Sequence, residues 1–212
     1  MILDLLFSQP MVFVAWLIAI IFSISIHEFA HAYAANSQGD PTAKLLGRLT
    51  LNPLSHIDPM GFFALLLVGF GWGRPVPVNP VNFRNKKWGD IIVSFAGPLS
   101  NFVMILTFGF ILKMTYLYTN LGQDNLMIQF LFFIVMINVV LGVFNLIPIP
   151  PLDGSHILFS ILPSSFNEFK YQLAKNGPML LLVLILADNF LNIGIFSSLF
   201  NYIFNLVGKL IF

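Results

Sequence analysis

Three apolar runs, each long enough to cross a lipid bilayer, constrain the fold of this chain more than any other feature of its sequence. They cover residues 11–35, 91–112 and 126–147. A spanning helix needs about 20 predominantly apolar residues, because each residue adds about 1.5 Å through a hydrocarbon core about 30 Å thick. The composition agrees, since 58% of the residues are hydrophobic and only 9% are charged, unlike an ordinary soluble domain. The sequence therefore predicts an all-α polytopic membrane protein with three core transmembrane helices.

The region between the first two predicted spans, residues 43–88, is polar and rich in turns. Its apolar segment at 61–71 is too short to cross a bilayer, so we expect it to be re-entrant or interfacial. Gly47 to Leu54 could form a short strand. Trp72 to Pro80 contains three prolines, which forbid a helix or a central strand but allow an extended edge. We expect a partly embedded loop region with short strands here.

The chain is short enough that one domain is the natural expectation. We expect a single membrane-embedded domain over residues 1–212, with its core at 11–160 and a C-terminal membrane segment at 178–212. Asp188-Asn189 interrupts that segment, so it forms either one tilted span or a half-helix followed by a span. The N-terminus lacks the basic region of a cleavable signal peptide, so the first apolar run should be retained as a spanning helix.

Charge and cysteine content exclude several classes of protein and orient the chain in the membrane. The net charge of +1 does not imply a nucleic-acid partner, and the absence of cysteine excludes disulfides and thiolate zinc sites. With the N-terminus outside, eight of the ten basic residues fall on the cytoplasmic side, as the positive-inside rule requires. The eight are Lys44, Arg48, Arg74, Arg84, Lys86, Lys87, Lys170 and Lys175, whereas Lys113 and Lys209 fall outside. We expect a multi-pass protein of a prokaryotic cytoplasmic membrane.

The first apolar run carries the pattern His-Glu-x-x-His at residues 27–31. Residues four apart share one face of a helix, so both imidazoles, those of His27 and His31, can reach one ion. Glu28 lies about 100° further round the helix, close enough to touch a water on that ion. Two neutral imidazoles beside a carboxylate base are what metal-assisted peptide hydrolysis needs. A buried polar cluster that only packs helices is the alternative, but ionisable groups at membrane depth are costly and usually functional.

A catalytic zinc usually takes a third protein ligand, and Asp153 is the best choice for it. It follows the helix-breaking run Pro148 to Pro151 and emerges on the same side of the membrane as the histidine pair. An unpaired aspartate at that depth would cost about 2.5–3.5 kcal/mol, which a metal partner would offset. The alternative is a turn or an N-cap for the segment that starts at Ser155. The remaining acids and histidines that we considered are Asp40, Asp58, Asp90, Asp188, His56 and His156.

Two of those histidines and one mid-span amide have several possible roles. His56 lies in a turn-rich stretch, where a loop histidine bonded to backbone is the simplest interpretation and a supporting or gating role is the alternative. His156 follows Asp153 by three residues and suits a cap or an interface better than a contact to the metal site. Gly97 to Asn101 favours close helix packing with a proline kink, but Asn101 needs a polar partner within the span.

Three motifs together resemble the site-2 protease family of intramembrane zinc metalloproteases over residues 11–160. They are His-Glu-Phe-Ala-His, Gly-Pro-Leu-Ser-Asn and Asn-Leu-Ile-Pro-Ile-Pro-Pro-Leu-Asp-Gly. The resemblance implies one Zn²⁺ per chain, with His27, His31 and Asp153 as its ligands and Glu28 as the catalytic base. It also implies regulated proteolysis of membrane proteins and a role for Asn145 in binding the substrate backbone. Unlike larger members, this chain is expected to have neither an inserted peptide-binding domain between its spans nor a C-terminal nucleotide-binding domain.

The expected substrate is a transmembrane helix that partly unwinds, because helical carbonyls are shielded by their own hydrogen bonds. The extended edge near 72–80 could hold the unwound strand by β-addition. Val76 and Val78 would then share one face of that strand, and Asn101 is a further residue that could contact substrate. The alternatives to a protease are a membrane transporter or ion pathway, whose broken helices look similar, and a zinc-bound scaffold without activity. Substrate identity and oligomeric state stay open.

Overall fold

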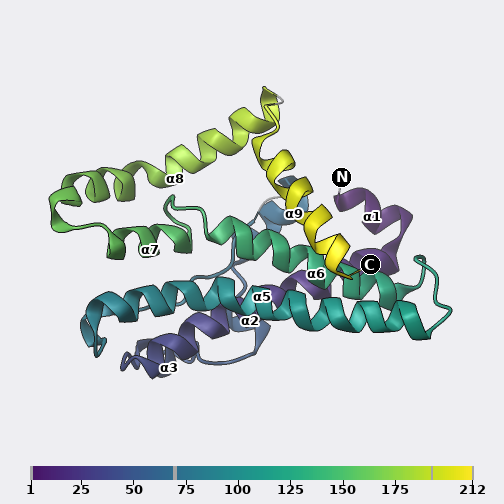
Figure 1. Ribbon diagram of the computed structural model, residues 1–212, viewed down its shortest axis with the longest axis horizontal. Coiled ribbons are helices and arrows are strands. Elements are labelled where there is room, and N and C mark those ends of the chain that lie inside the picture. Colours follow the sequence, from purple (N-terminus) through teal and green to yellow (C-terminus); the bar gives the residue numbers. More distant parts are fainter. Residues whose placement is uncertain (1, 69–70, 192, 212) are drawn as a thin grey trace.

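The structure, a computed structural model, describes residues 2–68, 71–191 and 193–211, and within these ranges every regular element is a helix (Figure 1). The only β-type pairing among the described residues is an isolated bridge between Ile57 and Gly73. The prediction of an all-α polytopic membrane protein is therefore confirmed.

Three long helices form the core: α2 (Pro10–Ser37), α5 (Lys86–Tyr118) and α6 (Leu126–Asn145). Within the described residues, these three are the helices long and apolar enough to cross a membrane. Each of them packs against the other two, and α5 and α6 lie side by side along the long axis (Figure 1). The three predicted spans are therefore correct, although α5 extends beyond its apolar run at both ends.

Local sequence explains where these helices begin. Proline occupies the first turn of α2, where its missing N–H costs nothing. The side chain of Asn85 accepts a hydrogen bond from Trp88 N at the start of α5, and Asn125 accepts one from Met127 N at the start of α6. Such caps satisfy backbone donors that a first helical turn leaves unpaired.

Prolines end α6 and aim the next helix back at the core. The run from Pro148 to Pro151 follows the last residue of α6, and proline can neither donate to a helix nor accommodate the preceding turn. The chain then turns into α7 (Asp153–Ile161), which packs against α5. Asp153 therefore stands at the first turn of a helix that faces the bundle.

The loop region between α2 and α5 contains short helices rather than strands. It holds α3 (Thr42–Leu45), a 3₁₀ helix at Pro53–Ser55 and α4 (Pro59–Val68). The expectation of a strand at Gly47–Leu54 is wrong. Pro53 there starts a 3₁₀ turn, and the Asn52 side chain caps it by accepting from Leu54 N, so local capping replaces a ladder that has no partner strand. α4 has ten residues and is too short to cross, as expected.

Residues 72–80, called the extended segment below, leave α4 and run back past α2. The segment contains no helix before Pro80, where a 3₁₀ turn begins, as its prolines predict. Gly73 forms the isolated bridge to Ile57, and the N–H of Arg74 donates to the carbonyl of His56 at 2.8 Å. The predicted extended edge is present, and in the described ranges it forms a β-bridge at one point, Gly73.

The C-terminal region forms two helices, α8 (Asn167–Phe190) and α9 (Ile195–Ile211), after a 3₁₀ turn at Ser164–Phe166. Gly194, at φ +80°, lies in the break between them, in a conformation that glycine adopts without strain. Asp188 accepts hydrogen bonds from the N–H groups of Ile195 and Phe196 and so caps α9. The alternative of a single tilted span over 178–212 is therefore wrong. At the other terminus, α1 (Ile2–Ser8) packs against α2.

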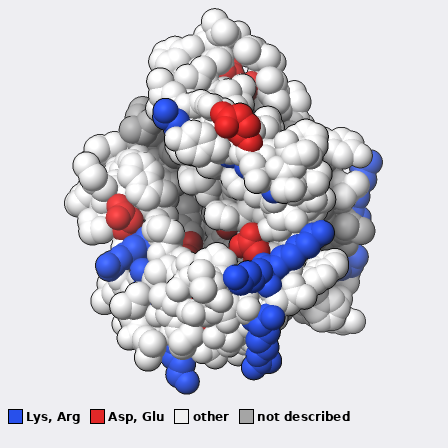
Figure 2. All heavy atoms as spheres, turned by 90° about the vertical axis from the view of Figure 1, so that its left-hand side faces the viewer, with Lys and Arg blue, Asp and Glu red and all other residues white. Residues whose placement is uncertain are grey.

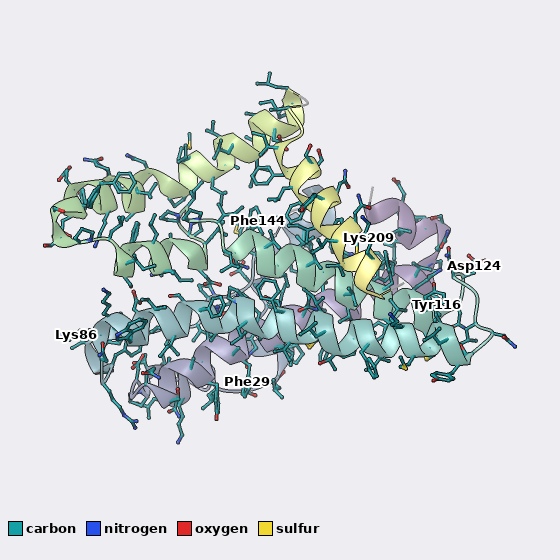
Figure 3. All side chains as sticks on the ribbon, viewed as in Figure 1. Phe29, Lys86, Tyr116, Asp124, Phe144 and Lys209 are labelled. Carbon is teal, nitrogen blue, oxygen red and sulfur yellow. The ribbon has the colours of Figure 1, made fainter. Side chains whose placement is uncertain are left out.

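The two ends of the helical core differ in the residues that they present. Figure 3 shows Lys86 at one end of the molecule and Tyr116 and Asp124 at the opposite end. Figure 2 faces the end that carries Lys86 and shows many Lys and Arg side chains across it. The loops that the charge pattern assigns to one side of the membrane thus include the start of α5 and lie away from the α5–α6 connection.

Candidate metal centre

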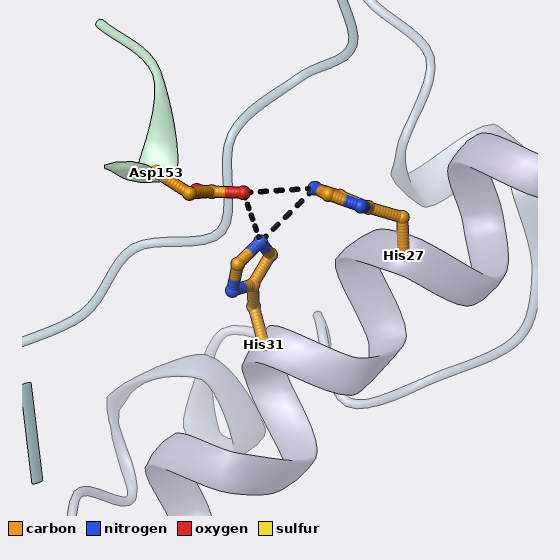
Figure 4. Close-up of side chains that lie close together, drawn as sticks. All are labelled: His27, His31 and Asp153. Atoms are coloured by element: carbon orange, nitrogen blue, oxygen red, sulfur yellow. Dashed lines mark hydrogen bonds and ion pairs between the residues drawn. The ribbon is translucent and has the colours of Figure 1, made fainter. Parts of the chain in front are cut away.

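His27 and His31 project from consecutive turns of α2 towards one point (Figure 4). Both side chains are buried, at 5% and 8% exposure. Their Nε2 atoms lie 3.1 Å apart. Helical spacing of four residues thus brings the two imidazoles together, as the motif predicts.

Asp153 completes a triangle of three ligand atoms from the first turn of α7. Its Oδ2 lies 3.3 Å from His27 Nε2 and 3.2 Å from His31 Nε2. The centre of such a triangle is roughly 1.9 Å from each corner, close to the Zn–N and Zn–O distances of about 2.0–2.2 Å. The structure therefore brings together the three residues that the sequence analysis selected as ligands.

The hydrogen bonds of the two Nδ1 atoms determine whether each Nε2 atom carries a proton or a free lone pair. His27 Nδ1 lies 2.7 Å from the Asn101 Oδ1, and His31 Nδ1 lies 2.7 Å from the Val93 carbonyl oxygen. Both partners are acceptors, so each neutral ring carries its proton on Nδ1 and presents a bare lone pair at Nε2. Asp153 Oδ2 is buried without a hydrogen-bond partner among the described residues. Three acceptors that face one another without a hydrogen between them fit a bound cation.

Gly97 on α5 leaves the space that this arrangement needs. A Cβ atom at this position would collide with the Nε2 atoms of both His27 and His31. Only glycine lets the α5 backbone approach the ligand pair so closely. The motif Gly-Pro-Leu-Ser-Asn thus contributes to the site in two ways. Gly97 leaves space for the two imidazoles, and Asn101 orients His27.

Glu28 follows His27 on α2 and lies outside the ligand triangle. Its side chain is half-buried, and its Oε2 accepts a hydrogen bond from the N–H of Val76 at 3.1 Å. The extended segment therefore lies directly against the carboxylate predicted to be the base.

A cavity of about 1740 Å³ contains the triangle and Glu28 in its wall. The rest of its lining is largely apolar and comes from the extended segment and from all the α-helices except α3. Val76, Val78 and Asn145 line this cavity, and in the part of the chain that the structure describes the Asn145 amide bonds only the Leu141 carbonyl, at 3.0 Å. Asn101 does not line it and is fully buried. The roles of these residues in substrate binding stay predictions.

The other acids considered as a third ligand have different partners. Asp40 accepts hydrogen bonds from Asn79 N and the Asn82 amide, and Asp58 accepts one from Gly61 N. Asp90 accepts the hydroxyl hydrogen of Ser160, and Asp188 caps α9.

The two remaining histidines also lie outside the triangle. His56 is fully buried and its Nε2 contacts the Thr50 carbonyl at 2.8 Å, which is the backbone-bonded loop histidine that we expected. His156 is exposed at the cavity wall.

Sequence reasoning missed two contacts of the site. The Val93 carbonyl that orients His31 is a backbone atom and leaves no trace in the sequence. Asn138 is a polar residue in the middle of a predicted span, which was a usable signal, but its partner Asn101 is 37 residues away.

Known proteins similar to this chain carry the names of zinc metalloproteases. Residues 111–187 match Peptidase family M50. The Bacillus subtilis protein named "Putative zinc metalloprotease YwhC" is 40% identical over 176 residues, which cover 80% of this chain and 79% of that protein. "Putative zinc metalloprotease Rip2" of Mycobacterium tuberculosis is 31% identical over 204 residues, covering 93% of this chain and 74% of the relative.

A shorter match adds a third relative. "Protease RseP" of Photorhabdus luminescens is 36% identical over 77 residues, or 32% of this chain and 34% of that protein. No solved structure matches the chain.

Proposed function

The chain belongs to peptidase family M50, and from this premise and the site geometry we propose that His27, His31 and Asp153 hold the zinc of this membrane-embedded zinc metalloprotease. We assign Glu28 as the base that drives hydrolysis of peptide bonds in membrane-spanning substrates. The observation that carries the assignment is the convergence of three buried acceptor atoms within 3.3 Å of one another.

The chemistry divides between the ion and the side chain beside it. Bound zinc supplies Lewis acidity towards a peptide carbonyl and lowers the pKa of water. Glu28 takes the proton of the attacking water and later delivers it to the leaving amine nitrogen. Glu28 is half-buried, and the one hydrogen bond that it accepts among the described residues, from Val76 N, uses Oε2, which leaves Oε1 available for this transfer.

The cavity supports an apolar substrate in an extended conformation. Its largely apolar lining suits the side chains of a membrane span, and its size allows several residues to enter unwound. The extended segment lies along it with Val76 and Val78 at the wall, where an unwound strand could pair with its edge. We assign Asn145 to bonding the substrate backbone, because within the described ranges its amide bonds only the Leu141 carbonyl.

The site faces the cytoplasm in this proposal. Eight of the ten basic residues lie between the end of α2 and the first turn of α5 or in the first half of α8, which favours a cytoplasmic location for these parts. His27 and His31 lie in the C-terminal half of α2, whose end leads into the basic region, so we expect the ligands to lie nearer that face than the middle of the membrane. A prokaryotic cytoplasmic membrane fits this orientation and the bacterial relatives.

Metal analysis of the purified protein in detergent tests the ligand assignment. We expect one zinc per chain in the wild type and a loss of at least about tenfold in zinc affinity in Asp153→Ala. Asp90→Ala is the matched control, because Asp90 lines the same cavity but bonds Ser160 rather than the histidines. Equal zinc affinity in both variants would remove Asp153 from the ligand set.

A further inference from the structure

The hydrogen bond that orients His27 is the first link of a chain that crosses all three core helices. From α2, His27 Nδ1 donates to Asn101 Oδ1 on α5 at 2.7 Å. Asn101 Nδ2 in turn donates to Asn138 Oδ1 on α6 at 2.8 Å. The series of hydrogen bonds then returns to α2 at Ser23, which lies one helical turn before His27. We call these four side chains the relay.

The far end of the relay fixes its direction. Asn138 Nδ2 donates to Ser23 Oγ at 2.8 Å and to the Ile134 carbonyl at 2.7 Å. The Ser23 hydroxyl donates to the Ala19 carbonyl at 2.8 Å. A backbone carbonyl can only accept, so Asn138 must keep its NH₂ group on this side and its oxygen towards Asn101.

Burial makes the orientation of the Asn101 and Asn138 amides costly to reverse. Ser23, Asn101 and Asn138 each have 0% exposure, so no solvent can replace a lost partner. Turning either amide over would set donor against donor or acceptor against acceptor, and a buried unpaired polar group costs about 1–3 kcal/mol. Each amide orientation is therefore imposed by the next residue along the relay.

The direction of the relay decides which nitrogen of His27 is free. With the Asn101 oxygen facing Nδ1, the imidazole proton stays on Nδ1 and the lone pair at Nε2 points at the ligand triangle. If Asn101 turned over, its NH₂ group would face Nδ1 and move the proton to Nε2, where it would occupy the ligand position.

We propose that Asn138 and Ser23 are positioning residues that, through Asn101, hold His27 in the tautomer that binds zinc. Neither residue touches the ligand triangle, and neither belongs to the sequence motifs that identify the site. This inference rests on the proposed role of His27 as a ligand and extends that role to two residues on other turns and helices. Partners that orient a ligating histidine typically change metal affinity 10–100-fold when they are removed.

Ser25 provides a matched control for Ser23. Both serines are buried on α2, at 3% and 0% exposure, and both donate to the carbonyl four residues earlier. Only Ser23 also accepts a hydrogen bond from Asn138. Ser23→Ala and Ser25→Ala therefore remove the same atom and the same local bond but differ in whether the relay is broken.

The test measures zinc affinity by competition with a chelator, and the absorption spectrum of the cobalt-substituted protein, in bilayer nanodiscs. We expect about tenfold weaker zinc binding in Ser23→Ala, up to about 100-fold in Asn138→Leu and wild-type binding in Ser25→Ala. The double variant Ser23→Ala/Asn138→Leu should bind zinc no more weakly than Asn138→Leu alone, because both substitutions break the same relay. The cobalt spectrum should change in the relay variants and not in the control.

Metal-free thermal unfolding separates positioning from simple helix packing. A relay that only holds helices together would lower the unfolding temperature of the metal-free variants and leave zinc affinity at the wild-type value, and that result would overturn the proposal. So would an equal loss of affinity in Ser25→Ala. If Asn138→Leu does not fold, the comparison of the two serine variants decides. A wild type that binds no zinc would instead contradict the proposed function itself.

Discussion

At Asp40, burial and hydrogen bonding act on one carboxylate in opposite directions. Burial disfavours the charged form and would raise the pKa, but four hydrogen bonds, from Asn79 N, the Asn82 amide and both the hydroxyl and N–H of Thr42, favour it. The net effect is a pKa below the ordinary value of 3.8. Asp40 lies beyond the end of α2, and its partners Asn79 and Asn82 lie on and just after the extended segment.

This shift predicts how acid affects the fold. A depressed carboxylate pKa stabilises the folded state above the unfolded pKa, and that stability is lost as pH falls through the folded pKa. We expect the unfolding temperature of the wild type to fall as pH drops below about 4, and the advantage of the wild type over Asp40→Asn to shrink over the same range. Thermal unfolding in detergent between pH 3 and 7 measures this. An advantage that is constant with pH would contradict it.

Single residues show how far sequence alone could go. The proximity of His27 and His31 could be predicted because residues four apart share one face of a helix, and Glu28 is adjacent to His27 in the sequence. Asp153 was recognisable because prolines must break the preceding helix. The relay was not, since Ser23 and Asn138 are 115 residues apart and nothing in a sequence records the direction of a buried amide.

Among the elements, the extended segment is held to the rest of the protein at several points. Arg48 Nη2 donates to the Arg74 carbonyl at 2.5 Å, Val76 N–H donates to Glu28 at 3.1 Å, and Asn79 N–H donates to Asp40 at 2.7 Å. These contacts hold the segment in place where it lines the cavity. We therefore expect the segment to act as a fixed template for a substrate strand rather than as a loose loop.

A charge on this template should interfere with substrate and leave the metal in place. We expect Val76→Asp to reduce cleavage of a membrane-spanning substrate about tenfold or more, because a buried unpaired charge meets an apolar chain, while zinc content stays at the wild-type value. Val81→Asp is the control, since Val81 is 72% exposed and does not line the cavity. Val78 is less suitable, because it packs against the buried cluster that includes Ala35 and Phe83. Full activity in Val76→Asp would leave the segment without a role in binding.

The long, apolar helices could be predicted from the sequence, whereas the short elements could not. The spans within α2, α5 and α6 follow from long apolar runs that have no alternative in a membrane. The prediction of a strand at Gly47–Leu54 was wrong because a short β-like pattern cannot form a ladder without a partner strand. Pro53 begins a 3₁₀ turn there instead, and the Asn52 side chain caps it. The C-terminal break was undecided because it depends on Asp188 reaching across to cap α9.

The orientation of the whole molecule rests on the placement of its basic loops. The chain contains no cysteine, so single cysteines can be introduced at Ser37, Asn85, Asn120 and Asn167, all of which are exposed. We expect a membrane-impermeant thiol reagent added outside intact cells to label Asn120→Cys only. Strong labelling of Asn85→Cys under the same conditions would invert the proposed topology.

The central claim is that this membrane-embedded site cleaves peptide bonds with Glu28 as its base, and Glu28→Gln tests it most directly. Glutamine keeps the shape and an oxygen that can accept the Val76 N–H, but it cannot take a proton from water. The measurement is the cleavage rate of a membrane-spanning substrate, with zinc content determined on the same bilayer-reconstituted samples. We predict wild-type zinc content and cleavage at least about 100-fold slower in Glu28→Gln. Cleavage at the wild-type rate would contradict the account, and loss of zinc would show that Glu28 is a ligand rather than the base.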